Sequence, residues 1–222
     1  MVERIHNYFR SLGLDDEEAE SLHMRYYKEY GLAIRGLVQH HAIDPLDYDQ
    51  KCDASLPLEE ILRPDARLIG MLKSLKSRKT RVFSLTNAYR VHARRVLSLL
   101  QLDSIVEGIV YCDYTNPEFS CKPEAEFYLA AQEAVHAAPT AQHYFVDDSI
   151  ANVRQAIKLG WSKSVHYDEH GDFHEPFTTP DGILRLCARS IACGRPRRVR
   201  PCRPRRPVET RTWMRQSRGR IQ

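Results

Sequence analysis

The sequence predicts an α/β fold in which a Rossmann-like parallel sheet is flanked by helices, and three observations predict it. Short apolar runs alternate with amphipathic helical patterns between residues 65 and 168. Several of these runs end in small polar or acidic residues and pass directly into a helix, as strands of parallel sheets do. The first 64 residues show helical periodicity alone, which predicts a small α-helical domain beside the sheet.

The N-terminal zone, residues 1–64, begins with an amphipathic helix. Four apolar residues recur at helical spacing and a glycine stop follows them: Val2, Ile5, Phe9, Leu12 and Gly13. The next helix, over 14–31, opens with acidic residues that suit a helix N-terminus and ends at Gly31. Two shorter helices are predicted over 32–43 and 55–64. We expect no strand in this zone.

The second zone, residues 65–175, supplies the sheet and its covering helices. Helices are predicted over 66–78, 88–102, 122–135 and 149–160, and strands over 81–87, 107–113, 143–148 and 162–167. Three helices have an apolar face for packing, made of Leu68, Met71, Leu72 and Leu75, of Val91, Val96, Leu99 and Leu100, and of Ile150, Val153 and Ile157. In such sheets ligands bind beyond the carboxyl ends of the strands.

The third zone, residues 176–222, is rich in arginine and proline. Residues 189–222 hold twelve arginines and one acid, so this segment carries +11 and residues 1–188 carry −7 of the formal net charge of +4. We predict a disordered tail, because its apolar content is too low for a core. One alternative is an arm that binds nucleic acid through phosphates, with Trp213 for stacking; the other is translated intron or frame-shifted sequence.

Composition and cysteine spacing indicate the cellular compartment of the protein. No apolar run approaches the roughly 18 residues of a membrane span, and the N-terminus lacks the apolar core of a signal peptide. None of the six cysteines forms a C-x-x-C pair or lies at metal-finger spacing with histidines, which indicates reduced thiols. We therefore expect a cytoplasmic or nuclear protein with no membrane partner.

Polar side chains gather near the ends of the predicted strands. Thr86 ends one strand, Lys122 precedes Pro123 in "CKP", and Asp147 and Asp148 end "HYFVDD". A hydroxyl beside backbone amides suits phosphate oxygens, a lysine supplies positive charge, and an acid pair suits a hard cation such as Mg²⁺. The sequence therefore predicts a phosphoryl-handling site along one rim of the sheet, where Asp113 also lies.

Each of these residues also has a structural interpretation. Thr86 or Asn87 could cap the helix that follows, Lys122 could be a solvated surface charge, and Asp148 or Ser149 could cap the last helix. Capping accounts for one aspartate but not for two in succession after an apolar strand. The order and strand-end placement of the set favour the functional interpretation.

The segments "SLTN", "CKP" and "YFVDDS…N" resemble motifs II, III and IV of the haloacid dehalogenase superfamily of phosphatases. Over about residues 1–168 the chain resembles more narrowly the pyrimidine 5′-nucleotidase branch, through "RYYKEYGLAIRGLV", "TNAYRVHARRVL", "YCDY" and "FVDDSIANV". The resemblance implies that Thr86, with Asn87, binds the phosphoryl group, that Lys122 neutralises its charge, and that Asp148 with Asp147 holds Mg²⁺. It also implies that residues 1–64 are a cap that covers the site.

The sequence departs from this family at motif I, a strand ending in D-x-D that supplies the nucleophile and the general acid/base. No such strand precedes the cap, and the one D-x-D segment, Asp47 to Asp49, lies in the helical zone. By the family's strand order the first strand lies between "RVFSLT" and "HYFVDD", so its absence predicts two half-sheets with open edges. We expect this chain to be an incomplete, inactive product of a longer gene or gene model.

Several functions remain open at this point. The first is Mg²⁺-dependent hydrolysis of a nucleoside 5′-monophosphate, UMP or CMP by resemblance; the second is a non-catalytic relative that binds a phosphorylated metabolite or a partner protein. A phospho-accepting receiver uses similar residues, but its acids come first and its Lys-Pro last. In the cap, polar or stacking groups for a substrate are Tyr26, Tyr27, His40, His41 and especially Arg35, which could meet a base or phosphate.

Overall fold

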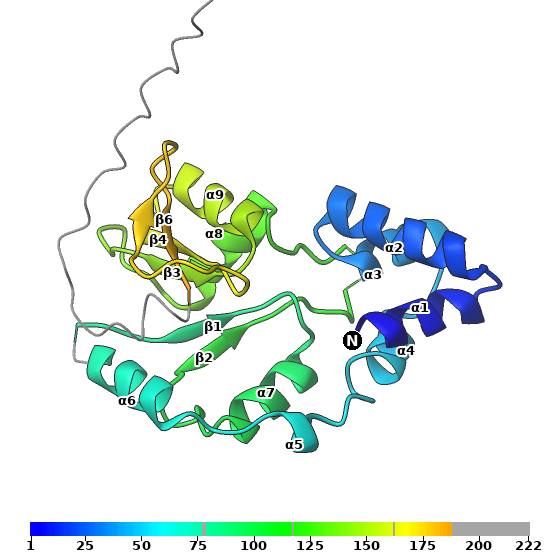
Figure 1. The fold of residues 1–222 in the computed structure, drawn as a ribbon, viewed down its shortest axis with the longest axis horizontal. Coiled ribbons are helices and arrows are strands. Elements are labelled where there is room, and N and C mark those ends of the chain that lie inside the picture. The colour runs from blue at the N-terminus through cyan, green and yellow to red at the C-terminus, as the bar shows by residue number, and fades with distance from the viewer. Residues whose placement is uncertain (77–78, 117, 162, 188–222) are drawn as a thin grey trace, which may run out of the picture.

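A computed structural model of the chain describes residues 1–76, 79–116, 118–161 and 163–187. Its helices are α1 (Val2–Ser11), α2 (Asp16–Tyr30), α3 (Ala33–His41), α4 (Pro45–Lys51), α5 (Leu58–Ile61), α6 (Ala66–Leu75), α7 (Arg90–Leu99), α8 (Ala125–Ala134) and α9 (Ile150–Lys158). Its strands are β1 (Phe83–Leu85), β2 (Gly108–Val110), β3 (Tyr144–Asp147), β4 (Lys163–Tyr167), β5 (Phe177–Thr178) and β6 (Leu184–Leu186). Figure 1 shows α1 to α4 grouped at one end, apart from the strands.

The cap helices begin and end where local chemistry dictates. Asp15 and Glu18 form a reciprocal capping box at the start of α2, and Gly31 ends this helix in the left-handed conformation, with φ of 73°. Asp44 caps α4, with Pro45 in its first turn. No strand occurs among the described residues of this zone, as predicted.

The cap and the rest of the fold share one apolar cluster. From the cap it takes Phe9, Tyr26, Ile34 and Leu37, among others, and from the segment between β2 and α8 it takes Cys112, Tyr114, Phe119 and Cys121. Burial of these side chains stabilises the attachment of the cap, because apolar area leaves water on both sides of the contact. The helix α5, by contrast, lies against α7.

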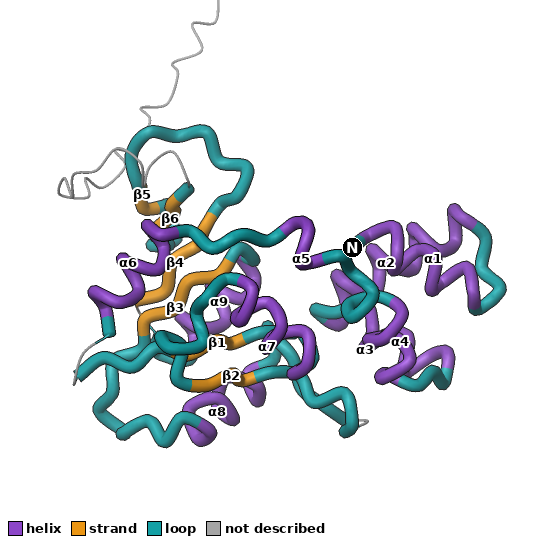
Figure 2. Tube along the Cα trace, turned by 90° about the horizontal axis from the view of Figure 1, so that it is seen from below, coloured by secondary structure: helices purple, strands orange, loops and turns teal. Residues whose placement is uncertain are grey.

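The strands form two separate sheets. In the first, β1 pairs with β2 in parallel; in the second the order is β3-β4-β6-β5, parallel except for the antiparallel pair β5 and β6. Helices accompany both sheets (Figure 2). The α/β prediction is confirmed, and so is the split: among the described residues no strand pairs with the outer edge of β1 or of β3.

The missing strand pairing between the two sheets leaves apolar side chains exposed. On β3, Tyr144 is 69% exposed and Val146 is 62% exposed. Phe145, in contrast, belongs to a second apolar cluster, which also contains Tyr128, Val153 and Trp161. The predicted apolar face of α6 is not packed either, since Met71 and Leu75 are about half exposed. The prediction that this face is covered was wrong, because a helical pattern identifies a face but not the presence of a partner for it.

Two further expectations need correction. Val91 of α7 is exposed rather than packed, and Ala93 takes the buried position in this helix. The tail predicted from residue 176 begins too early, because β5 and β6 pair and extend the second sheet to Leu186. A Thr179 hydroxyl and Gly182, with φ of 84°, form the tight connection between these strands. The basic segment 189–222, including Trp213, lies outside the described residues.

No helix among the described residues is both long and apolar enough to cross a lipid bilayer. The four cysteines in this part of the chain, Cys52, Cys112, Cys121 and Cys187, are buried and not joined in disulfides, as predicted from their spacing.

Candidate functional site

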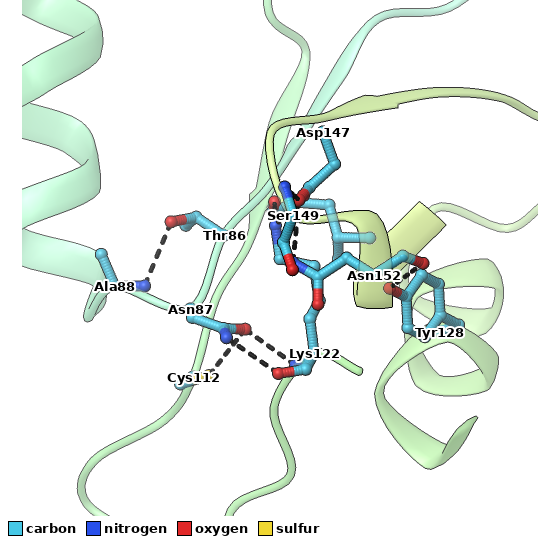
Figure 3. A network of polar contacts seen from close by, with 10 residues as sticks. Thr86, Asn87, Ala88, Cys112, Lys122, Tyr128, Asp147, Ser149 and Asn152 are labelled. Carbon is cyan, nitrogen blue, oxygen red and sulfur yellow. Dashed lines mark hydrogen bonds and ion pairs between the residues drawn. The ribbon is translucent and has the colours of Figure 1, made fainter. Parts of the chain in front are cut away.

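Asn87, in the turn after β1, fixes Lys122, in the segment before α8, although 35 positions separate them in sequence. The side-chain oxygen of Asn87 accepts a hydrogen bond from the Lys122 backbone N–H at 2.8 Å, and its amide nitrogen donates to the Lys122 carbonyl at 3.0 Å (Figure 3). Both sides of the Asn87 amide are therefore occupied. Asn87 holds the lysine in place, and the second N–H of its amide and its backbone N–H donate to no described residue.

The Lys122 side chain continues into a buried ion pair. Its ammonium group donates to Asp147 Oδ2 at 2.7 Å and to the Leu85 carbonyl, the last residue of β1, at 2.8 Å. The other oxygen of Asp147 accepts hydrogen bonds from the Ser149 backbone N–H and from the Asn152 amide, both at 2.8 Å. Lys122 and Asp147 are each 8% exposed. A buried charge pair with every oxygen engaged is rigid, so the positive charge has a fixed position.

Asp148, the second acid of the pair, has a different environment. It is exposed, and no described residue donates a hydrogen bond to its carboxylate. Its backbone carbonyl lies 2.8 Å from His166 Nε2, which anchors the turn after β3. The two adjacent acids therefore differ: Asp147 positions Lys122, and the Asp148 carboxylate is exposed and accepts no hydrogen bond from a described residue.

Thr86 occupies the corresponding turn after β1. Its backbone N–H donates to the Val110 carbonyl at 2.9 Å, and its hydroxyl oxygen accepts from the Ala88 N–H at 3.1 Å (Figure 3). The hydroxyl proton is still available for a ligand oxygen. The helix-capping interpretation is wrong, because the N-cap of α7 is Tyr89 and no side chain caps this helix; Thr86 closes only a local turn before it.

These residues open onto a cavity of about 1360 Å³ between the cap and the sheets, which we call the cleft. Thr86, Asn87, Lys122 and Asp148 all line it from the side of the sheets. The opposite wall comes from α1 and α2 and includes Ile5, His23, Met24, Arg25, Tyr27 and Lys28. Ligand sites of small molecules are concave and of comparable or smaller size, so the cleft accommodates more than a phosphate group.

Arg35, expected to contact substrate, does not line the cleft. Its guanidinium group forms an ion pair with Glu124 at 2.9 Å, donates to the Phe119 carbonyl and lies over the Phe119 ring. The expected substrate contact is therefore wrong, and Arg35 instead links α3 to the segment before α8. Arginine suits this role because its planar group binds a carboxylate and a ring together.

The other cap candidates divide between the interior and the cleft. Tyr26 is 2% exposed, stacks on His40, and its hydroxyl lies 2.9 Å from His41 Nε2, so these three side chains interact with one another. Tyr27 lines the cleft and is 51% exposed. Asp113 ends in a local turn, where it accepts hydrogen bonds from Thr115, and it is not among the residues that line the cleft.

Three residues that matter to this geometry were not singled out from the sequence. Asn152 lies one turn into α9 and fixes Asp147, and the spacing "DDSIAN" could have indicated it. Tyr114 donates to the Asn87 carbonyl at 3.2 Å, and the Leu85 carbonyl holds Lys122; neither contact has a local sequence signal, because both join distant segments.

The arrangement agrees with what the chain is similar to. Residues 2–160 match the family described as haloacid dehalogenase-like hydrolase. Phosphate metabolism protein 8 of Saccharomyces cerevisiae is 38% identical over 178 residues, which are 76% of this chain and 56% of the yeast protein. The chain thus spans about half the length of this curated relative. Among solved structures, a haloacid dehalogenase-like hydrolase from Bacteroides fragilis matches with a TM-score of 0.51 and 20% identity, over 84% of this chain and 90% of that chain.

Proposed function

The chain belongs to the family of haloacid dehalogenase-like hydrolases, and from this membership we propose that it binds phosphate monoesters in the cleft and acts in their Mg²⁺-dependent hydrolysis. The observation that carries the proposal is the buried pair of Lys122 and Asp147, joined to both β1 and β3 beside Thr86. A fixed ammonium group stabilises charge on phosphoryl oxygens without reorganising, which is the main protein contribution to phosphoryl transfer.

In this proposal each residue has one task. Thr86 donates its hydroxyl, and the Asn87 backbone N–H, which donates to no described residue, is left for the same phosphoryl oxygens. Lys122 neutralises charge on those oxygens. Asp147 keeps Lys122 in place, since its own oxygens are engaged with Lys122, Ser149 and Asn152.

Asp148 fits a magnesium ion that is shared with the substrate. Mg²⁺ is commonly bound by one or two carboxylates together with substrate phosphate and water. The Asp148 carboxylate lines the cleft and has no protein donor, and the described residues contain no cluster of three metal-binding side chains that would hold a metal alone. When bound there, Mg²⁺ would draw charge from the phosphoryl oxygens. Asp147 would support it only indirectly, through the turn that both aspartates share.

The substrate class that we favour is a nucleoside 5′-monophosphate such as UMP or CMP. The size of the cleft and the exposed Tyr27 on its cap wall support a leaving group larger than a simple alcohol. The sequence resemblance to the pyrimidine 5′-nucleotidase branch supports the same class. The yeast relative carries only the name of a phosphate metabolism protein.

A second candidate is a non-catalytic phosphate-binding relative. The observation that favours it is that none of the described strands ends in a D-x-D pair, the motif that would supply the attacking carboxylate. Without that group Thr86, Lys122 and Asp148 bind the ester but do not form a phospho-enzyme, and the rate falls by many orders of magnitude, about 10⁴ to 10⁶ in other covalent catalysts.

The test measures binding and turnover separately. Calorimetric titration of the 222-residue chain with UMP and Mg²⁺ should show binding that Lys122→Ala abolishes and that Asp148→Ala makes independent of Mg²⁺. Phosphate release from UMP should be undetectable with this chain. Binding that neither substitution affects would refute the assignment of the site, whereas measurable release would refute the need for a further carboxylate.

A further inference from the structure

A second group of polar side chains lies in the cleft, where the segment after α4 meets α7. Asp53 lines the cleft and is 8% exposed, and no described residue donates a hydrogen bond to its carboxylate. Burial raises the pKa of this carboxyl to about 6, against the opposite effect of the Met1 α-amino group. A buried acceptor directed into a cavity without a donor is costly unless a ligand satisfies it.

The backbone that follows Asp53 is held by a side chain of α7. Arg95 donates to the Ala54 carbonyl at 2.8 Å and to the Leu56 carbonyl at 2.9 Å. Arg95 also binds Glu59 through two hydrogen bonds. Such clamping gives the Asp53 carboxylate a fixed direction, as a recognition group requires.

One tyrosine connects Asp53 with the phosphate-binding residues. Tyr114 lines the cleft and donates its hydroxyl to the Asn87 carbonyl at 3.2 Å, and Asn87 in turn holds Lys122. Burial raises the pKa of Tyr114, and the negative charge of Asp53 adds to this effect. Asp53, Tyr114, Thr86 and Lys122 all line the same cavity, so one ligand can reach both Asp53 and the phosphate-binding residues.

The chemistry of Asp53 limits what it can bind. An ionised carboxylate only accepts hydrogen bonds, so its partner must carry hydroxyl or amino groups, and it repels a second anion. Asp49, the neighbouring buried acid, does not line the cleft and has a buried oxygen without a partner.

We propose that Asp53 is the residue that selects the leaving group of the phosphate ester. Its carboxylate accepts hydrogen bonds from hydroxyl groups of a sugar or amino groups of a base, and it disfavours leaving groups that are themselves anionic. Arg95 acts as a positioning residue for it, through the backbone that follows Asp53. The inference rests on the proposed function, since it assumes that the phosphoryl group lies at Thr86 and Lys122.

The experiment is calorimetric titration of the 222-residue chain at pH 7.5 with Mg²⁺, using UMP and phenyl phosphate as paired ligands. Phenyl phosphate has the same phosphoryl group but no donor on its leaving group. Asp53→Ala should weaken UMP binding by about 10- to 100-fold, the effect of a lost hydrogen bond to a charged group, and change phenyl phosphate binding less than twofold. Asp49→Asn is the matched control and should leave both affinities unchanged.

Each other outcome has a definite meaning. Equal loss for both esters in Asp53→Ala would overturn the proposal, because it would show a structural role for Asp53. UMP binding no tighter than that of phenyl phosphate in the parent chain would also overturn it, while the phosphate site would stand. If the parent chain binds neither ester nor inorganic phosphate, the proposed function fails, and the selection of a leaving group fails with it. Thermal melting of each variant checks its folding independently of any ligand.

Discussion

At the scale of single residues, the two adjacent aspartates have different environments and different proposed roles. Asp147 is buried and satisfied by Lys122, Ser149 and Asn152, whereas Asp148 is exposed in the cleft. One carboxylate inside and one outside avoids the repulsion of two free charges, since the inner charge is neutralised. The pair is thus explained by a division of labour across a single peptide bond.

Breaking the buried pair of Lys122 and Asp147 should lower the free energy of unfolding far more than breaking an exposed pair. Lys122→Met leaves Asp147 charged and buried without its cation, and we expect a loss of about 3–5 kcal/mol in the free energy of unfolding. Lys51→Met is a matched control, because Lys51 and Asp47 form an exposed pair at 2.8 Å and should contribute about 1 kcal/mol or less. Urea denaturation of both variants measures the difference, and equal losses would contradict this account.

The buried acid Asp49 makes stability depend on pH. Burial raises the pKa of this carboxyl to about 6, with the charge of Asp53 acting in the same direction. Between about pH 4 and pH 6 the folded chain therefore binds more protons than the unfolded chain, and the free energy of unfolding falls as pH rises. Asp49→Asn removes this contribution and should stabilise the chain by about 1–2 kcal/mol at pH 7.5.

The same substitution should have little effect at pH 4, where Asp49 is already protonated in the folded state. Thermal melting at both pH values checks the prediction, with the exposed Asp103→Asn as control. A gain at pH 4 as large as that at pH 7.5 would show that titration of Asp49 is not the cause.

The common placement of the site residues could be predicted from the sequence, while their roles stay predictions. Thr86, Lys122 and Asp148 line one cleft because strand ends of an α/β fold meet at one rim, and that rule needs no coordinates. The ion pair of Arg35 and the hold of the Asn87 side chain on Lys122 were not foreseen, for the opposite reason. Their partners, Glu124 and the Lys122 backbone, come from segments that only the folded chain brings near.

At the scale of elements, the cap is attached through a close backbone contact. Gly31, at the end of α2, lies against the Lys122 carbonyl, and a Cβ atom there would be 2.5 Å from that oxygen. Gly31 also has φ of 73°, so its lack of a side chain serves both the helix end and the contact. The position of Lys122 therefore depends on a helix terminus in the cap.

Gly31→Ala should damage both stability and ligand binding. A left-handed alanine costs about 1–2 kcal/mol, and the clash with Lys122 adds about 1–3 kcal/mol. Gly13→Ala is the matched control, because Gly13 has φ of 91° but no atom within 4 Å of its added Cβ. Denaturation should show a larger loss for Gly31→Ala, and only that variant should bind inorganic phosphate more weakly. Equal stabilities and affinities in both variants would contradict the contact.

Elements were predictable to the extent that their signals are local. The helices of the cap follow from the Asp15 box and the Gly31 stop, and the helix after Asp148 follows from its apolar spacing. The strands β5 and β6 were missed because they have two and three residues, although Asp181 and Gly182 between them form a turn dipeptide. The exposure of α6 could not be foreseen, since it depends on what the rest of the fold places beside it.

At the scale of the whole molecule, the two sheets meet at their ends but not along their edges. Lys122 donates to Leu85 at the end of β1 and to Asp147 at the end of β3, yet these strands share no pairing. Unpaired edges and the exposed Tyr144 and Val146 are sites where a further strand could add. Met1 and Val2 line the cleft that the ends of these strands also line, so a segment joined before Met1 by a linker starts within the same cavity.

A variant extended at the N-terminus should therefore test fold and chemistry together. We expect an added segment with a five-residue apolar strand ending in D-x-D, joined by a flexible linker, to pair with β1 and β3. The free energy of unfolding should rise by several kcal/mol, since buried hydrogen bonds contribute about 1 kcal/mol each, and Mg²⁺-dependent phosphate release from UMP should appear.

Replacing the first added aspartate with asparagine should retain the stability gain and abolish release, because the strand remains while the nucleophile is lost. A stable extended chain that releases no phosphate would place the chemistry of this cleft elsewhere, and an extension without any gain in stability would show that the open edges of β1 and β3 do not accept a strand.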